Sequence, residues 1–138
     1  MTRTAGLDVG ERTIGIAVSD LLGITAQGLD TIRRSQMEMD LQHIINILKD
    51  YDVNLVVIGL PKNMNNTLGP SADKARMFGN ELSKRTGIEV KYWDERLTTV
   101  SAQRTLLEGD VSRKKRKQVV DKIAAVMILQ NYMDSANR

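Results

Sequence analysis

The chain has 138 residues, of which 41% are hydrophobic and 27% are charged, and its net charge is +3, so it suits one folded domain with a sizeable core. It contains no cysteine, which excludes disulfides, thiolate metal sites and a cysteine nucleophile, and its one histidine, His43, cannot form a histidine cluster. No apolar run is long enough to span a membrane and no signal peptide is recognisable, so we expect a cytoplasmic protein with a single domain over residues 1–138.

The first stretch, residues 3–19, predicts two apolar strands, at 3–9 and 13–19, joined by a turn that begins at Gly10. Asp8 lies near the end of the first strand, where a buried carboxylate is costly unless something pairs with it. It is either a metal-binding carboxylate on the floor of a cleft or an acceptor of turn hydrogen bonds, which is common for Asp near a hairpin.

The next stretch predicts a third antiparallel strand at 24–33 and an amphipathic helix at 36–51, with His43 on its polar, solvated side. The continuously apolar run at 55–60 is typical of a strand buried on both faces of a parallel sheet.

The loop at 61–70 contains Pro, Gly and three Asn, and it follows the carboxyl end of that strand, where open α/β sheets bind ligands. Lys62 and Asn63 are therefore candidates for contacts to phosphate or ribose oxygens. The alternative is an ordinary loop that leads into the next helix.

A helix at 72–85 and a strand at 88–93 come next, and Asp94, Glu95 and Arg96 follow that strand. Two acids and a guanidinium at a strand end can hold a metal and a substrate phosphate, or they can form a surface salt-bridge cluster.

A short helix at 98–107 and a break at 108–112 lead into five consecutive cations, Arg113, Lys114, Lys115, Arg116 and Lys117, called here the basic block. The block repels itself, and its place between two structured pieces favours a nucleic-acid contact over a solvated loop. The last helix is predicted at 118–133, with Asp121 at the head of a core-facing stripe.

Three acids from separate elements, Asp8, Glu95 and Asp121, are thus candidates for one site. Carboxylates without His or Cys suit hard cations such as Mg²⁺ or Mn²⁺. Two such ions could stabilise the attacking and leaving oxygens of a phosphodiester displacement.

Four motifs occur in order along the chain: Gly6-Leu7-Asp8-Val9-Gly10, Val57-Ile58-Gly59-Leu60-Pro61-Lys62-Asn63, Asp94-Glu95-Arg96-Leu97-Thr98-Thr99 and Asp121-Lys122-Ile123-Ala124-Ala125. Together they resemble the YqgF family of pre-16S ribosomal RNA nucleases, which are related to Holliday-junction resolvases. The resemblance spans essentially the whole chain.

The resemblance implies an α/β, ribonuclease H-like fold with a five-stranded mixed sheet in the order β-β-β-α-β-α-β-α-α. It implies that Asp8, Glu95 and Asp121 are the metal-binding and catalytic acids. The resolvase relatives carry a fourth acid one turn from the acid of the last helix, where this chain has Gln118 and Ala124.

Two hypotheses follow. The first is a divalent-metal-dependent nuclease that processes the 5′ end of pre-16S ribosomal RNA during ribosome assembly, or cleaves branched DNA as a resolvase does. The second is a non-catalytic nucleic-acid-binding protein. Three converging acids favour the enzyme, because a pure binder has no need of them. Phosphate contacts do not distinguish structured RNA from branched DNA.

Overall fold

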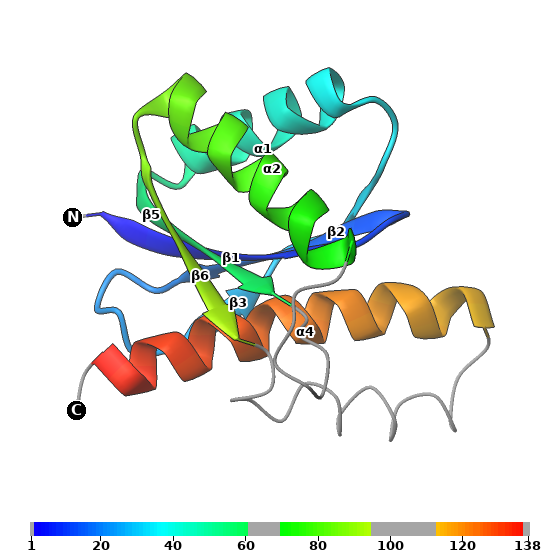
Figure 1. The fold of residues 1–138 in the computed structure, drawn as a ribbon. Coiled ribbons are helices and arrows are strands. Elements are labelled where there is room, and N and C mark those ends of the chain that lie inside the picture. The colour runs from blue at the N-terminus through cyan, green and yellow to red at the C-terminus, as the bar shows by residue number, and fades with distance from the viewer. Residues whose placement is uncertain (1, 61–69, 95–112, 137–138) are drawn as a thin grey trace.

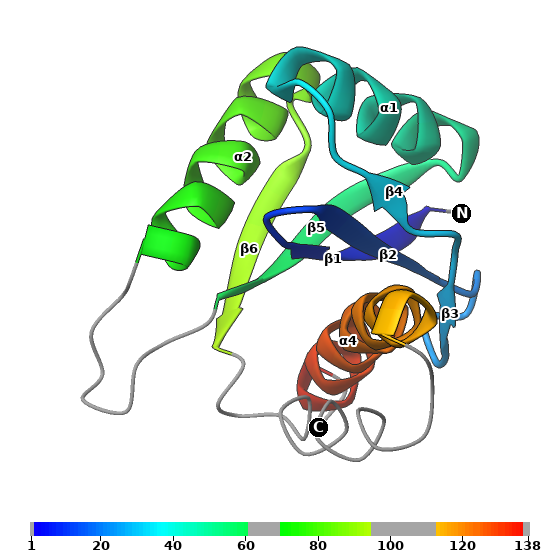
Figure 2. The same ribbon diagram turned by 90° about the vertical axis from the view of Figure 1, so that its right-hand side faces the viewer.

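The structure is a computed structural model that describes residues 2–60, 70–94 and 113–136, with the backbone alone for 70–71 and 113–121. A single sheet is sandwiched between two helices on one face and one long helix on the other (Figures 1 and 2). The strands are β1 (Arg3–Val9), β2 (Thr13–Ser19), β3 (Ala26–Gly28), β4 (Ile32–Arg33), β5 (Val53–Leu60) and β6 (Glu89–Asp94). The helices are α1 (Met37–Asp50), α2 (Pro70–Thr86) and α4 (Arg113–Ala136). None of these three helices is both long and apolar enough to cross a membrane.

The sheet is mixed, and β1 lies at its centre. The strand order is β3-β2-β1-β5-β6, with β4 also paired to β2. β1 is antiparallel to β2 and parallel to β5, which is in turn parallel to β6. The predicted mixed α/β sheet is therefore confirmed, and Asp8 lies on its central strand.

The predicted third strand, 24–33, is instead two short strands, so the described residues form a sheet of six strands rather than the five predicted. Gly28 of β3 pairs with Ala17, and Ile32 of β4 pairs with Ile14. Three residues separate Gly28 from Ile32, but only two separate Ile14 from Ala17, so one extra residue bulges out of the ladder. Asp30, a poor strand former, is exposed at this interruption.

The other elements predicted among the described residues, apart from the last helix, begin and end within two residues of their predicted bounds. Residues 61–69 of the predicted loop and the predicted helix at 98–107 lie outside the described residues, and Pro70, predicted as the last loop residue, begins α2.

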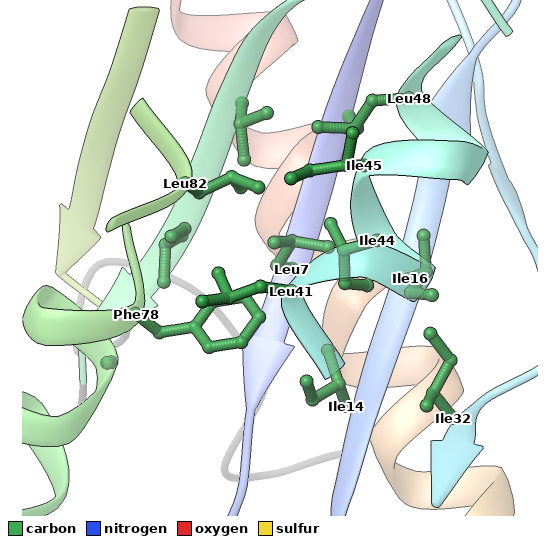
Figure 3. Packing of buried hydrophobic residues seen from close by; sticks show 14 of the residues in the cluster. Leu7, Ile14, Ile16, Ile32, Leu41, Ile44, Ile45, Leu48, Phe78 and Leu82 are labelled. Carbon is green, nitrogen blue, oxygen red and sulfur yellow. The ribbon is translucent and has the colours of Figure 1, made fainter. Parts of the chain in front are cut away.

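The larger core lies between the sheet and the helices α1 and α2. Figure 3 shows Leu7 of β1 and Ile16 of β2 meeting Ile44 of α1 and Phe78 of α2. All four side chains are fully buried. Because side chains alternate along a strand, the residues next to Leu7 in β1 face the opposite side, toward α4.

On that opposite side, α4 lies directly on the backbone of β1. A Cβ atom added to Gly6 would lie 2.7 Å from the Cβ of Leu129 and 3.0 Å from the carbonyl oxygen of Ala125. At the edge of the sheet, the Ala26 N–H donates to Oε1 of Gln130 over 2.9 Å, and Nε2 of Gln130 donates to the Ile24 carbonyl over 2.8 Å. The helix is thus held against the sheet both by close approach and by hydrogen bonds.

Replacing Gly6 with Ala is expected to destabilise the protein by about 1–3 kcal/mol, the usual cost of overpacking a well-packed core. The added methyl group meets helix backbone and a Cβ atom, which cannot move aside as a flexible side-chain end could. Urea unfolding of the two proteins measures the difference. Equal unfolding midpoints would mean that α4 shifts outward at no cost, contrary to this expectation.

Candidate metal and nucleic-acid site

Asp8 is a nearly buried carboxylate on the central strand, with 8% of its surface exposed. It lies two residues beyond Gly6 in β1 and therefore on the same face of the sheet, beneath α4. A carboxylate at such a position is a candidate cation ligand, because carboxylate oxygens suit hard cations such as Mg²⁺.

The floor around Asp8 is largely bare backbone. Gly15 of β2 is its partner across the antiparallel ladder. On the other side, Gly59 follows Ile58, the partner of Leu7, just as Asp8 follows Leu7. On this row, therefore, neither neighbouring strand places a side chain beside the carboxylate.

The element that carries Asp121 is brought toward Asp8. The backbone of residue 121 lies in α4, one turn before Ala125, whose carbonyl approaches Gly6. Gln130 contacts Ala26, whereas Lys122 approaches Gly28, so α4 runs opposite to β3 and to β1 (Figure 1). Its N-terminal turns therefore extend toward the half of β1 that contains Asp8.

Four other predicted site residues lie in parts of the chain that the structure does not describe. Glu95 comes directly after the last residue of β6, and it lies outside the described residues together with Arg96, Lys62 and Asn63. Among the side chains that the structure describes, in residues 2–60, 72–94 and 122–136, no three His, Asp or Glu gather in a group that could hold a metal. The convergence of Asp8, Glu95 and Asp121 stays a prediction.

The basic block, Arg113–Lys117, is helical, which corrects the prediction of an irregular segment followed by a helix at 118. α4 begins at Arg113 and has no acidic residue in its first turn. Arg and Lys are good helix formers, and the apolar periodicity used to predict the helix begins only beyond them. Positive charge at a helix N-terminus opposes the helix dipole, so an anion bound there would stabilise these turns.

An ion pair between half-buried Arg34 and buried Asp40, which the sequence analysis missed, fixes the turn after Asp8. Nη1 of Arg34 donates to the Gly10 carbonyl over 3.0 Å, and its Nε donates to Asp40 Oδ2 over 3.2 Å. The Ser35 N–H donates to the other oxygen of Asp40, which is only 2% exposed. The sequence contains a pattern that would have predicted the burial of Asp40. Asp40 lies four residues before Ile44 and so belongs to the apolar stripe of α1.

Comparisons with known proteins agree with this architecture. A family model described as RuvX, Holliday junction resolvase, matches residues 2–135. A protein of Heliobacterium modesticaldum is 62% identical over 133 residues, which cover 96% of this chain and 89% of that protein. One of Clostridium beijerinckii is 54% identical over 136 residues, which cover 99% of each. Both relatives bear the name "Putative pre-16S rRNA nuclease".

Two solved structures share the fold. RuvC of T. thermophilus, in complex with a Holliday junction substrate, has a TM-score of 0.63 at 14% identity, over 99% of this chain and 96% of that one. The resolvase of Fowlpox virus with Holliday junction DNA has a TM-score of 0.54 at 10% identity, over 99% and 100%. At such identities the likeness concerns the fold alone, and it confirms the ribonuclease H-like architecture. Since the family model covers nearly the whole chain and relatives exceed 50% identity over the same length, this protein belongs to the RuvX family, the group that the four motifs indicate as YqgF.

Proposed function

We propose that this chain is a metal-dependent nuclease that hydrolyses phosphodiester bonds at the 5′ end of pre-16S ribosomal RNA. The observation that carries the proposal is the 8%-exposed Asp8 carboxylate on the central strand, beside glycine backbone, in a chain of the RuvX family. The names of the curated relatives support the RNA substrate. The described elements all belong to one sheet and its two covering layers, which supports a single domain over 1–138.

Asp8, Glu95 and Asp121 would hold Mg²⁺ or Mn²⁺, as two ions. The donor chemistry fits, because oxygen ligands suit hard cations, while His43 is exposed on α1 and the chain has no cysteine. Bound ions would supply charge stabilisation at the attacking and leaving oxygens of the displacement. The chain's own part is to hold the Asp8 carboxylate still, through ladders on both sides of β1 and the hydrogen bond from Arg34 to Gly10.

We propose that Lys62, Asn63, Arg96 and the basic block, Arg113–Lys117, bind the substrate's phosphates. The protein would then act in the cytoplasm, in association with ribosome assembly. The helical conformation of the basic block supports its role in binding phosphates. One anionic nucleic-acid strand lying across these turns would relieve the repulsion between the five cations and their unfavourable interaction with the helix dipole.

A second candidate function is the resolution of four-way DNA junctions, which the description of the family model and the fold of RuvC favour. Gln118 and Ala124 stand where the resolvase relatives carry a fourth acid, which weakens the case for a second metal and for junction cleavage. A third alternative is a protein that binds nucleic acid without cleaving it.

The test is a cleavage assay with Mg²⁺ or Mn²⁺ on four substrates: precursor ribosomal RNA, single-stranded RNA, duplex DNA and a four-way junction. We expect cleavage of the precursor RNA that disappears when the metal is chelated. Preferential cutting of the junction would favour the resolvase. Binding of every substrate without cleavage of any would favour the non-catalytic alternative.

Replacing the five residues of the basic block with Gln should weaken binding and reduce its dependence on salt. Gln keeps the helix propensity of this segment, so charge is the main change. Each lost phosphate contact should remove about 0.9 from the log–log slope for duplex and about 0.7 for single strands. As a control, Lys74→Gln with Lys84→Gln removes exposed cations from α2 instead. An unchanged slope in the block variant would assign these cations to solubility.

A further inference from the structure

A pocket of about 320 Å³ lies between the edge strand β6 and the last turns of α4. Its wall includes Val57, Lys91, Trp93, Tyr132, Ser135 and Ala136. This volume is at the small end of the range for ligand sites, so it suits a small, flat ligand rather than a large one. Lys91 and Ser135 are exposed at the pocket, whereas Trp93 and Tyr132 are half-buried in its wall.

Two aromatic rings in this wall are parallel. The planes of Trp93 and Tyr132 differ by 4°, and their centroids are 6.1 Å apart. Nζ of Lys91 lies 3.2 Å from the Tyr132 hydroxyl and 5.6 Å from the centre of that ring, so the ammonium sits toward the hydroxyl end of the ring. That hydrogen bond raises the pKa of Lys91 above its ordinary value, so the pocket keeps a positive charge at neutral pH.

Trp93 also contains a buried hydrogen-bond donor that has no acceptor among the described residues. Its Nε1 is buried and has no hydrogen-bond partner among the residues described. Buried donors are nearly always paired in folded proteins, so an unpaired one needs an explanation. Because this N–H lies in the plane of the indole, its partner would be an acceptor at the edge of the ring, such as a sugar or phosphate oxygen, and not a group stacked on the face of the ring.

The pocket lies on the same face of the sheet as Asp8 and on the same row. Leu7, Ile58 and Tyr92 pair with one another across β1, β5 and β6. The residues that follow them are Asp8, Gly59 and Trp93, so two strand spacings, about 10 Å, separate Asp8 from Trp93. Gly59 has no side chain, and therefore only backbone lies on this row between the carboxylate and the aromatic wall.

We propose that this pocket binds one unpaired nucleobase of a single-stranded nucleic acid. Stacking on the wall that Trp93 and Tyr132 form would hold the base, a sugar or phosphate oxygen of the same nucleic-acid strand would accept from Trp93 Nε1 at the edge of the ring, and Lys91 would contact a neighbouring phosphate. Base–aromatic stacking is tolerant of sequence because every base has a π-face. From this pocket, the bound nucleic-acid strand would continue along the row to Asp8. This continuation rests on the proposed nuclease function, whereas binding of the base does not.

Charge and hydrogen bonding favour a base over an apolar protein side chain. A Leu or Phe from a partner would fill the aromatic wall but would leave Trp93 Nε1 without an acceptor and Lys91 without an anion. A nucleotide carries sugar and phosphate oxygens beside its base, and these can supply both the acceptor and the anion. The pocket would therefore select unpaired over base-paired substrate, since a paired base cannot leave its stack without cost.

The experiment uses the fact that Trp93 is the only tryptophan in the chain, so fluorescence excited selectively at tryptophan reports on this pocket alone. The protein is titrated with a short single-stranded RNA, with an abasic strand of equal length and charge, and with duplex RNA, all in EDTA to prevent cleavage. We expect quenching by the single strand, and at least about tenfold weaker affinity for the abasic strand.

Tyr132→Leu should weaken binding of the single strand about tenfold and leave abasic binding unchanged. Tyr51→Leu, which removes a ring at the end of α1, is the matched control and should change neither. Equal affinity for the two strands, fluorescence that no strand changes, or a Tyr132→Leu variant that binds as the wild type does would each overturn the proposal. Base-dependent quenching in a protein that cleaves nothing would instead refute the nuclease while leaving the pocket as assigned.

Discussion

Asp8→Asn is expected to reduce metal-dependent cleavage by at least roughly a thousandfold while leaving the fold intact. Asn keeps the shape of the side chain but offers a hard cation only a weak carbonyl ligand. Metal ions contribute several kcal/mol to stabilising charge in such reactions, and each 1.36 kcal/mol corresponds to a factor of ten in rate. The cleavage assay on precursor RNA measures the loss. Binding through the basic block, Arg113–Lys117, should survive.

The thermal behaviour of the same variant tests whether Asp8 is a ligand or a structural residue. If three carboxylates converge, they repel one another without metal, so removing one should leave the metal-free protein as stable or slightly more stable. Wild type should melt higher with Mn²⁺, and Asp8→Asn should not. Asp30→Asn, at an exposed carboxylate between β3 and β4, controls for the loss of one charge. A lower melting temperature for Asp8→Asn, with no effect of Mn²⁺ on wild type, would contradict the hypothesis that Asp8 is a metal ligand.

Arg34→Met is expected to destabilise the protein by about 3–5 kcal/mol, the cost of breaking a buried ion pair by removing one partner. Asp40 is 2% exposed and would lose the guanidinium that lies 3.2 Å away. The Gly10 carbonyl would lose its donor as well. Urea unfolding measures the effect, which corresponds to a fall in melting temperature of roughly 10 °C or more.

The exposed pair Lys84 and Glu81, 3.9 Å apart, provides the control for this prediction. Lys84→Met should cost no more than about 1 kcal/mol, because surface ion pairs contribute little. Replacing Arg34 with Met and Asp40 with Leu together should recover part of the loss, since no buried charge is then left without a partner. If Arg34→Met costs no more than Lys84→Met, the pair does not secure the turn that follows Asp8.

Local patterns determined much of this fold. Two apolar stretches joined by a turn predict β1 and β2 with their observed bounds, and the 3.6-residue period in Leu41, Ile44 and Leu48 predicts α1 to within one residue at each end. These predictions succeed because the alternation of buried and exposed side chains is set within each element. The basic block was misassigned for the same reason, because a helix turn without apolar residues has no such period, although its propensity is adequate.

The arrangement of the site depends on contacts between elements that are far apart in the sequence, and only the tertiary structure decides those. The sequence by itself identifies Asp8 as a costly carboxylate in an apolar strand, and the four motifs indicate the family. It does not reveal that α4 runs back along β1 over Gly6, or that Arg34 reaches the Gly10 carbonyl. Nor does it reveal that Trp93 and Tyr132, 39 positions apart in the numbering, form one wall on the row of Asp8. Such contacts arise from strand register and helix packing, which are properties of the assembled layers and leave no period in the chain.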